Sequence, residues 1–305
     1  DRGKERGRPG CERFDEAMRA RATDRLRLQS DLRTALGSNQ LVVHFQPIVA
    51  PTSGRVTGTE ALVRWQHPER GLLQPDGFIP QAESTGLIIE LGRAVLDEAC
   101  RVTAKWNLGR VTPLTVAVNL SARQLADPGL LEAVAEALRE SGLAPELLHL
   151  EVTETVVMED PEASRQLLGQ LRSLGVRIAI DDFGTGYSSL AYLLTLPLDV
   201  LKIDRSFVAA TSDGVTGVAI VTAIVALAAS LKLAVIAEGV ETPEQRDVLT
   251  ALGLTSVQGW LWGGAVSADD DAWLLRAGVA PPRAELGVPR ARAASSVPAY
   301  PPCAR

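Results

Sequence analysis

The sequence has few of the residues that build disulfide scaffolds, soft-metal sites or aromatic faces. It contains 3 cysteines, 3 histidines and 2 methionines among 305 residues, and aromatic residues make up 4% of the chain. Cys11, Cys100 and Cys303 lie far apart and follow no metal-binding spacing, which predicts inert thiols in a reducing compartment. These shortages argue against a disulfide-rich secreted domain and against a structural zinc site.

An excess of basic residues is also missing. The chain has 31 Lys and Arg against 37 Asp and Glu, a net charge of -6 at pH 7 and a pI near 5.3. Proteins that bind nucleic acids usually carry a basic face, so we predict no DNA or RNA duplex binding. The chain begins without methionine or a signal peptide, which predicts a cytoplasmic piece of a longer protein.

One long apolar run, residues 215–237, has the length of a membrane span, for which about 20 apolar residues suffice. It is alanine-rich, is broken near Ser230, and carries Lys232 as its only charge. We therefore predict a buried helix over 216–230 followed by a buried strand over 233–237.

Short apolar runs alternate with helical patterns through most of the chain, and 46% of all residues are hydrophobic. The predicted strands cover 41–49, 56–65, 114–120, 147–152, 176–181, 198–204, 233–238 and 255–259. The predicted helices between them cover roughly 89–106, 129–141, 161–174, 188–195, 216–230 and 243–252. This alternation predicts an α/β fold with a parallel sheet, namely a (βα)8 TIM-like barrel, with a doubly wound open sheet as the alternative.

The first two predicted strands are joined only by "APTSG", which is too short for a crossover helix. The first strand is therefore predicted to run antiparallel to the second. We predict a connector over residues 1–39, with a helix over 14–36, a barrel over 40–280, and a disordered Pro/Ala/Arg-rich tail over 281–305.

Polar side chains stand at or near the carboxyl ends of the predicted strands after the first. They are Glu60, Asn119, Glu151, Asp181, Lys202, Glu238 and Gln258, and Asp182 follows Asp181 directly. Any one of them could be a helix cap or a solvated turn residue. In a barrel, however, these ends surround one mouth, where active sites lie.

The five carboxylates of this set outnumber their basic neighbours Lys202 and Arg64. Oxygen ligands without histidine or cysteine suit Mg²⁺, Mn²⁺ or Ca²⁺. Small residues stand two positions before four of the polar ones, which leaves room for a pocket: Gly58, Ala117, Ala179 and Ser256. Two cations about 4 Å apart would activate a water molecule and bind a phosphodiester oxygen.

Eight motifs in order resemble the EAL-domain cyclic di-GMP phosphodiesterases over residues 40–265. They are "FQPIV" (45–49), "TEALVRW" (59–65), "VNLS" (118–121), "EVTE" (151–154), "IDDFGTGYSSL" (180–190), "LKID" (201–204), "AEGVET" (237–242) and "QGWLW" (258–262). The resemblance implies a (βα)8 barrel with an antiparallel first strand. It also implies hydrolysis of the bacterial second messenger cyclic di-GMP to linear pGpG with Mg²⁺ or Mn²⁺, with Ca²⁺ inhibitory.

The resemblance also assigns roles to individual residues. The implied metal ligands are Glu60, Asn119, Glu151, Asp181, Asp182 and Glu238. Lys202 would orient or deprotonate the attacking water, which Gln258 would help to position. The implied substrate contacts are Arg64, Leu62 and Asp204, and Glu154 would anchor the loop 182–188, which couples metal binding to dimerisation.

Two further expectations concern the surroundings of the barrel. The N-terminal stretch resembles the connector of GGDEF-EAL proteins, which implies an upstream GGDEF-like domain and leaves sensory or membrane segments before it open. Apolar residues after the loop predict a homodimer: Leu190, Tyr192, Leu193 and Leu194.

Three questions stay open at this stage. "GWLWGGAV" (259–266) lacks the basic residue and proline usual in the family, which leaves guanine contacts or domain stability near Gly263 and Gly264 undecided. His149 shares a strand face with Glu151 and could support the site, whereas His44 and His67 fit a strand and a loop. The alternative functions are a catalytically silent cyclic di-GMP receptor and a barrel enzyme that stabilises an enolate with Mg²⁺.

Overall fold

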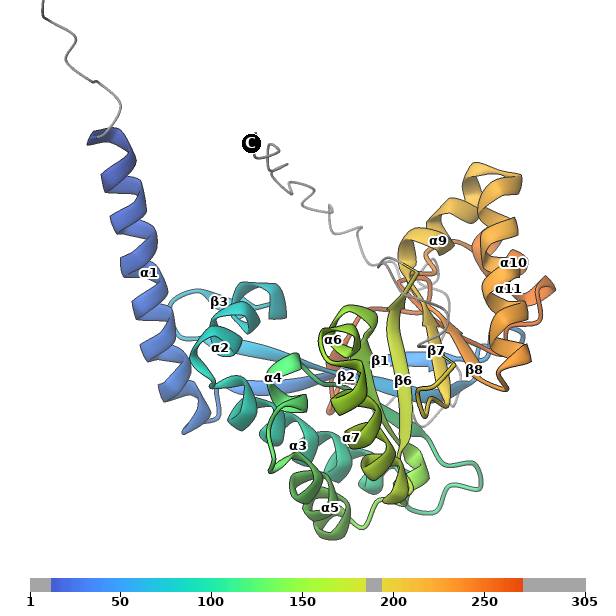
Figure 1. Ribbon diagram of the computed structural model, residues 1–305, viewed down its shortest axis with the longest axis horizontal. Helices are drawn as coiled ribbons and strands as arrows, with labels where there is room; N and C mark the ends of the chain where they lie inside the picture. The colour runs from blue at the N-terminus through green and yellow to red at the C-terminus, as the bar shows by residue number, and fades with distance from the viewer. Residues whose placement is uncertain (1–11, 185–193, 271–305) are drawn as a thin grey trace, which may run out of the picture.

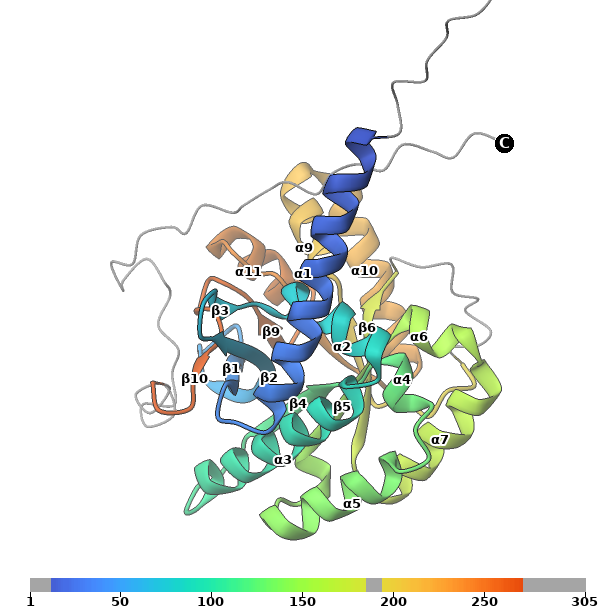
Figure 2. The ribbon, with the colours of Figure 1, turned by 90° about the vertical axis from the view of Figure 1, so that its left-hand side faces the viewer.

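The computed structural model describes residues 12–184 and 194–270, and eight of its strands close into a barrel surrounded by helices (Figures 1 and 2). In chain order the barrel strands are β1 (Leu41–Val49), β2 (Val56–His67), β4 (Thr115–Asn119), β5 (Leu148–Thr153), β6 (Arg177–Phe183), β7 (Val200–Ile203), β8 (Ala234–Ala237) and β9 (Ser256–Gln258). β1 pairs antiparallel with β2 and β9, and the other barrel pairs are parallel. The predicted TIM-like barrel with an antiparallel first strand is confirmed.

Two short strands extend the sheet at its edges and were not predicted. β3 (Gly71–Leu73) pairs antiparallel with the end of β2, and β10 (Val266–Ser267) pairs antiparallel with β1. Strands of three and two residues are too short to show the alternation on which sequence-based prediction depends.

The long helices agree with prediction to within two residues at each described end. The helices are α1 (Glu12–Leu36), α2 (Ile79–Thr85), α3 (Ile88–Asn107), α4 (Ala122–Leu125), α5 (Leu130–Ser141), α6 (Glu154–Glu159), α7 (Pro161–Ser173), α9 (Arg205–Ala210), α10 (Val215–Ser230) and α11 (Pro243–Ala251). The sequence did not reveal α2, α4, α6 and α9, because four to seven residues barely complete two helical turns. The predicted helix over 188–195 lies largely outside the described residues, as does the predicted tail over 281–305.

Among the described residues, three hydrophobic clusters stabilise the barrel. The largest lies between the strands and the surrounding helices, and includes Phe45, Val116, Leu150 and Ile178. The smallest consists of Ile48, Ala179, Val200 and Ile236. The third lies beneath α1, and we call it the α1 core. It consists of Leu28, Leu32, Ala35, Val63, Trp65, Phe78, Ala82, Ile88 and Leu91.

Helix α10 corrects one expectation from the sequence. It ends at Ser230 as predicted, but it is buried along one face only, through Gly217, Val221, Ile224 and Ala228. Val215, on the opposite face, is 88% exposed, and Ile220, beside the buried face, is 39% exposed. Among the described residues, no helix has both the length and the apolar character needed to cross a membrane.

Candidate active site

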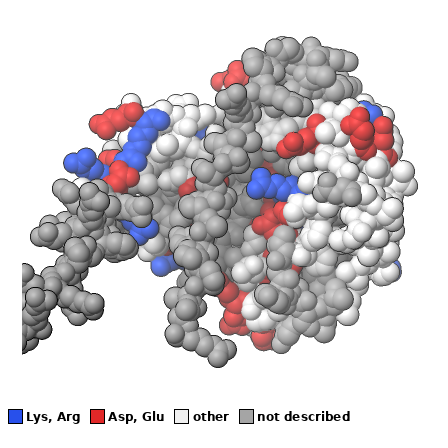
Figure 3. Space-filling model, turned by 90° about the horizontal axis from the view of Figure 1, so that it is seen from above, with Lys and Arg blue, Asp and Glu red and all other residues white. Residues whose placement is uncertain are grey.

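The polar residues at the strand ends converge on the side chain of Lys202, which projects from β7 and is fully buried. Its Nζ lies 2.7 Å from Glu151 Oε2, 2.5 Å from Glu238 Oε1, 3.5 Å from Asp181 Oδ1 and 3.6 Å from Glu60 Oε2. Seen from above, this end of the molecule has a hollow bordered by acidic side chains (Figure 3). The structure therefore brings together residues from β2, β5, β6, β7 and the loop after β8.

Glu60 is held by hydrogen bonds from two other strands. Asn119 Nδ2 donates to Glu60 Oε1 at 2.7 Å, and Gln258 Nε2 donates to Glu60 Oε2 at 2.7 Å. Burial by itself would raise the pKa of Glu60, but the Lys202 ammonium and these hydrogen bonds outweigh it, so the pKa lies below its usual value. Glu60 is thus a fixed carboxylate.

The other carboxylates around Lys202 are less well compensated. Burial and the neighbouring carboxylates raise the pKa of Glu151 well above its usual value, although Lys202 opposes this. Burial likewise raises the pKa of Glu238 to about 7. Burial disfavours the charged form of Lys202, but the four carboxylates prevail and raise its pKa, which keeps the ammonium protonated. One ammonium cannot neutralise four carboxylates, so the cluster can accept more positive charge.

Asp181 and Asp182 lie near the end of β6, where the pairing with β7 is irregular between Ile180 and Phe183. Asp182 has a φ of 53°, in the left-handed region that residues other than glycine rarely adopt. Its backbone N–H donates to Asp181 Oδ1 at 2.9 Å. Burial and the charges of Asp181 and Asp204 raise the pKa of Asp182. The charge of Asp181 therefore disfavours the ionised form of Asp182 in the metal-free protein.

Arg64 lies on β2, four residues after Glu60. It is only 8% exposed, and its Nη1 donates to the carbonyl oxygen of Val63 at 2.8 Å. Burial lowers its pKa, whereas the charges of Glu60 and Asp76 oppose that shift. Leu62, between Glu60 and Arg64 on the same strand face, is half-buried.

Asp204 and Glu154 hold local backbone in place. Asp204 is the N-cap of α9, where its Oδ1 accepts from the backbone N–H of Ser206 at 2.9 Å. Glu154 is buried at the start of α6, and its Oε2 accepts from the N–H of Gly184 at 2.9 Å. Glu154 thus contacts the first part of the loop that it was predicted to anchor, while residues 185–188 lie outside the described residues.

Gln46 belongs to the site, although the sequence assigned it no role. It lies directly across from Glu60 in the β1–β2 pairing. Gln258 Nε2 donates to Gln46 Oε1 at 3.1 Å, and Gln46 Nε2 donates to the carbonyl oxygen of Gly263 at 3.3 Å. The signal available in the sequence was the alternation of "FQPIV", which places this glutamine on the inner face once β1 is known to pair with β2.

The two unusual glycines after the last motif have structural explanations. Gly263 has a φ of 129°, which favours glycine, and its backbone rather than a side chain contacts Gln46. A Cβ atom on Gly264 would lie 2.8 Å from the indole ring of Trp260. The backbone conformation therefore explains Gly263, and packing against Trp260 explains Gly264.

His149 does not support the site through its Nε2, which is buried without a hydrogen-bond partner among the described residues. Burial, assisted by the charge of Arg177, lowers the pKa of His149 to about 4, so the ring is neutral near pH 7. His67, expected in a loop, instead ends strand β2.

The residues at the mouth fit a divalent cation. Two of their buried oxygen atoms, Glu151 Oε1 and Gln258 Oε1, have no hydrogen-bond partner. Within residues 12–184 and 194–270, no three acidic, histidine or cysteine side chains are already arranged around a common metal position. The Lys202 ammonium lies among the carboxylates instead. Carboxylate and amide oxygens are nevertheless the ligands that Mg²⁺ and Mn²⁺ prefer.

Curated relatives resemble most of this chain. It is 49% identical over 266 residues to the bifunctional diguanylate cyclase/cyclic di-GMP phosphodiesterase MucR of Pseudomonas aeruginosa, a match that covers 87% of this chain and 39% of MucR. It is 42% identical over 265 residues to the cyclic di-GMP phosphodiesterase PdeR of Escherichia coli, covering 87% of this chain and 40% of PdeR. The chain thus spans well under half of these relatives.

Solved structures resemble it as well. The P. aeruginosa MucR phosphodiesterase in complex with c-di-GMP is 50% identical with a TM-score of 0.76, covering 80% of this chain and 99% of that one. The FimX EAL domain of P. aeruginosa bound to c-di-GMP is 26% identical with a TM-score of 0.71, covering 79% and 96%. Residues 29–265 match the EAL domain. The barrel, its ordered motifs and these matches agree, and the chain belongs to the EAL domain family.

Proposed function

We propose that this chain hydrolyses cyclic di-GMP to linear pGpG, with Mg²⁺ or Mn²⁺ as cofactor. The observation that carries the proposal is the buried cluster of Glu60, Glu151, Asp181 and Glu238 around Lys202 at the barrel mouth. The names of MucR and PdeR support the reaction, and the c-di-GMP complex of MucR supports the substrate.

The metal would be held by oxygen atoms of Glu60, Asn119, Glu151, Asp181, Asp182 and Glu238. When bound, it supplies positive charge to the phosphodiester and lowers the pKa of a bound water. Gln258 and Asn119 fix both carboxylate oxygens of Glu60, which orients that ligand before binding.

Lys202 acts as a hydrogen-bond donor in this proposal. The surrounding carboxylates raise its pKa in the absence of metal, and with metal bound it would orient the attacking water or take its proton. Arg64 would contact a substrate phosphate, because a guanidinium matches phosphate oxygens in two directions. Leu62 and Asp204 would complete the substrate contacts.

A nucleotide assay on the 305-residue chain tests the reaction. We expect cyclic di-GMP to be converted to pGpG with Mg²⁺ or Mn²⁺, and EDTA or Ca²⁺ to stop the conversion. Glu60→Ala should lower activity most strongly at limiting Mg²⁺, whereas Glu90→Ala, at an exposed position of α3, should not. Binding in Ca²⁺ without turnover in Mg²⁺ or Mn²⁺ would indicate the silent receptor instead.

We also propose that the chain forms a homodimer. Leu194, the one described residue of the predicted apolar patch, is 62% exposed, and Leu190, Tyr192 and Leu193 lie outside the described residues. The exposed face of α10 adds an uncharged surface, because no charged residue occurs between Val215 and Leu231. Sedimentation should show a dimer at tens of micromolar chain. Ile220→Glu should weaken the association of the two copies. A monomer with full activity would contradict the proposal.

The upstream GGDEF-like domain, the boundary at residue 39 and the cytoplasmic location stay predictions. MucR, of which this chain spans 39%, is named as a bifunctional cyclase and phosphodiesterase, which supports an additional domain in the complete protein.

A further inference from the structure

Strand β2 carries site residues on one face and the α1 core on the other. Glu60, Leu62 and Arg64 alternate along the inner face. Val63 and Trp65 point the other way, into the α1 core with Leu28 and Leu32 of α1. The α1 core, which α1 shares with α2 and α3, thus lies behind the strand segment whose front presents Arg64.

The α1 core behind that segment also includes Phe78 of the segment before α2 and Ile88 of α3, but the segment has little support within the sheet. The pairing of β2 with β4 ends at Ala61, and β3 begins to pair only at Trp65. Residues 62–64 therefore pair with β1 alone. Arg64 lies on a two-stranded ribbon that extends past the closed part of the barrel, and isolated two-stranded ribbons are marginally stable.

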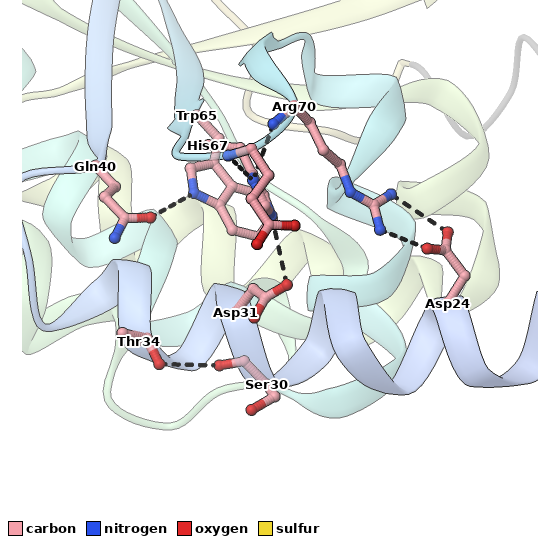
Figure 4. Close-up of polar contacts among 9 residues, drawn as sticks. Asp24, Ser30, Asp31, Thr34, Gln40, Trp65, His67 and Arg70 are labelled. Atoms are coloured by element: carbon pink, nitrogen blue, oxygen red, sulfur yellow. Dashed lines mark hydrogen bonds and ion pairs between the residues drawn. The ribbon is translucent and has the colours of Figure 1, made fainter.

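Polar contacts tie the end of this ribbon to α1 (Figure 4). His67 is buried, and its Nδ1 accepts from the backbone N–H groups of Glu69 and Arg70 at 3.1 and 3.3 Å. Because Nδ1 accepts, Nε2 is assigned as the donor to Asp31 Oδ2 of α1, at 3.4 Å. Asp24 of α1 pairs with the Arg70 guanidinium.

The segment after α1 contacts the same ribbon. Trp65 Nε1 donates to Gln40 Oε1 at 3.1 Å, and the N–H of Gln66 donates to the carbonyl oxygen of Gln40 at 2.8 Å. Among the described side chains of the helix, Leu28, Leu32 and Ala35 are buried and Leu36 packs partly against the same core. The N-terminal half of the helix projects away from the barrel (Figures 1 and 2).

We propose that α1 holds Arg64 in its substrate-binding position, with Leu32 and His67 as positioning residues. Loosening α1 from β2 frees the ribbon and weakens substrate binding, while the carboxylate cluster around Lys202 keeps its geometry. A movement of the projecting half of α1 therefore controls substrate affinity. This inference rests on the proposed function, since it takes Arg64 as a substrate contact.

The test compares Leu32→Ala and the milder Asp31→Ala with Leu26→Ala, which alters a 68% exposed position of the same helix. In Leu32→Ala we expect KM for cyclic di-GMP to rise about tenfold, the effect of losing one charge-assisted contact, with kcat and Mg²⁺ affinity nearly unchanged. Leu26→Ala should leave all three unchanged. An equal loss of kcat or Mg²⁺ affinity would overturn the proposal.

Two further readouts separate positioning from a general structural effect. In the Arg64→Ala background, Leu32→Ala should add little to KM, and fully additive effects would refute a role through Arg64. Amide hydrogen exchange should accelerate at residues 62–67 but not at 116–119 of β4. Exchange that is unchanged, or faster throughout the barrel, would contradict the inference. If the chain does not hydrolyse cyclic di-GMP, the same variants are compared by their Kd for this nucleotide instead of KM. The exchange measurement then still tests the inference separately from the proposed function.

Discussion

At the scale of single residues, Lys202 has two roles that can be measured separately. It compensates four carboxylates in the metal-free protein, and in the proposed reaction it orients water. A buried charge cluster that loses one partner is destabilised by about 3–5 kcal/mol. A divalent cation bound to the same carboxylates would replace the missing positive charge.

Lys202→Ala should therefore unfold at lower urea concentration in EDTA, and Mg²⁺ should restore most of the loss. Turnover should still fall by about 10² to 10⁴, because the cation cannot replace the donor. Urea denaturation with and without Mg²⁺ and a nucleotide assay measure both effects. Lys105→Ala, at an exposed position of α3, is the control. Equal destabilisation with and without Mg²⁺ would show that Lys202 does not compensate the metal-binding carboxylates.

Cys100 provides a second test at this scale. The thiol is fully buried, and burial together with the charge of Asp97 raises its pKa to about 12. At pH 8 only about 10⁻⁴ of a thiol with that pKa is ionised, against about 0.2 for an ordinary cysteine. Mass spectrometry should find Cys100 unmodified by iodoacetamide in the folded chain and modified in urea. Rapid modification without urea would contradict this packing.

At the scale of secondary-structure elements, Glu154 joins the start of α6 to the end of β6 through the N–H of Gly184. Glu154→Ala should loosen the segment after Asp181 and Asp182 and reduce turnover at limiting Mg²⁺ by about tenfold, with a smaller effect at saturation. Glu159→Ala, at an exposed position at the other end of α6, should not change turnover at either Mg²⁺ concentration. The measurement is a titration of activity with Mg²⁺ for both variants. If the two variants gave the same titration curve, Glu154 would have no anchoring role.

The contact between α9 and α10 depends on a glycine. A Cβ on Gly217 would lie 1.9 Å from the carbonyl oxygen of Ala210, whereas a Cβ on Gly169 of α7 would meet nothing within 4 Å. Gly217→Ala should destabilise the protein by about 1–3 kcal/mol through overpacking. Gly169→Ala should stabilise it by about 0.5–1 kcal/mol, because alanine favours helices. If chemical denaturation found Gly217→Ala more stable than Gly169→Ala, the close approach of Gly217 to Ala210 would be wrong.

At the scale of the whole molecule, cation binding should raise the thermal stability of the barrel. The proposed ligands come from β2, β4, β5, β6 and the loop after β8, so binding acts on elements around the whole barrel. At a free Mg²⁺ concentration 100 times Kd, the gain is about 2.7 kcal/mol. For a domain of this size that corresponds to a Tm higher by about 5–10 °C.

Scanning calorimetry with Mg²⁺, with Ca²⁺ and with EDTA measures this shift. Both cations should raise Tm, although only Mg²⁺ should support turnover, because Ca²⁺ prefers more ligands at longer distances. Asp181→Asn should reduce the shift, and Glu90→Gln should not. A Tm independent of both cations would contradict a metal site at the mouth.

Much of this protein follows from its sequence alone. The alternation of apolar strands and helical patterns determined the barrel, because each parallel strand must be buried on both faces. The short link between β1 and β2 determined the antiparallel start. The polar residues at the strand ends, such as Glu60 and Lys202, followed from the rule that these ends share one mouth.

Only the tertiary structure decided how these residues meet. The sequence could not show that Lys202 contacts four carboxylates at once, since the distances depend on the strand register. It gave no role to Gln46, whose contacts with Gln258 and Gly263 join residues more than 200 positions apart. Nor could it show α1 behind the ribbon of Arg64, because His67 and Asp31 become partners only when the helix folds back onto β2. Local periodicity determines elements, whereas contacts between distant residues are fixed by the closure of the barrel.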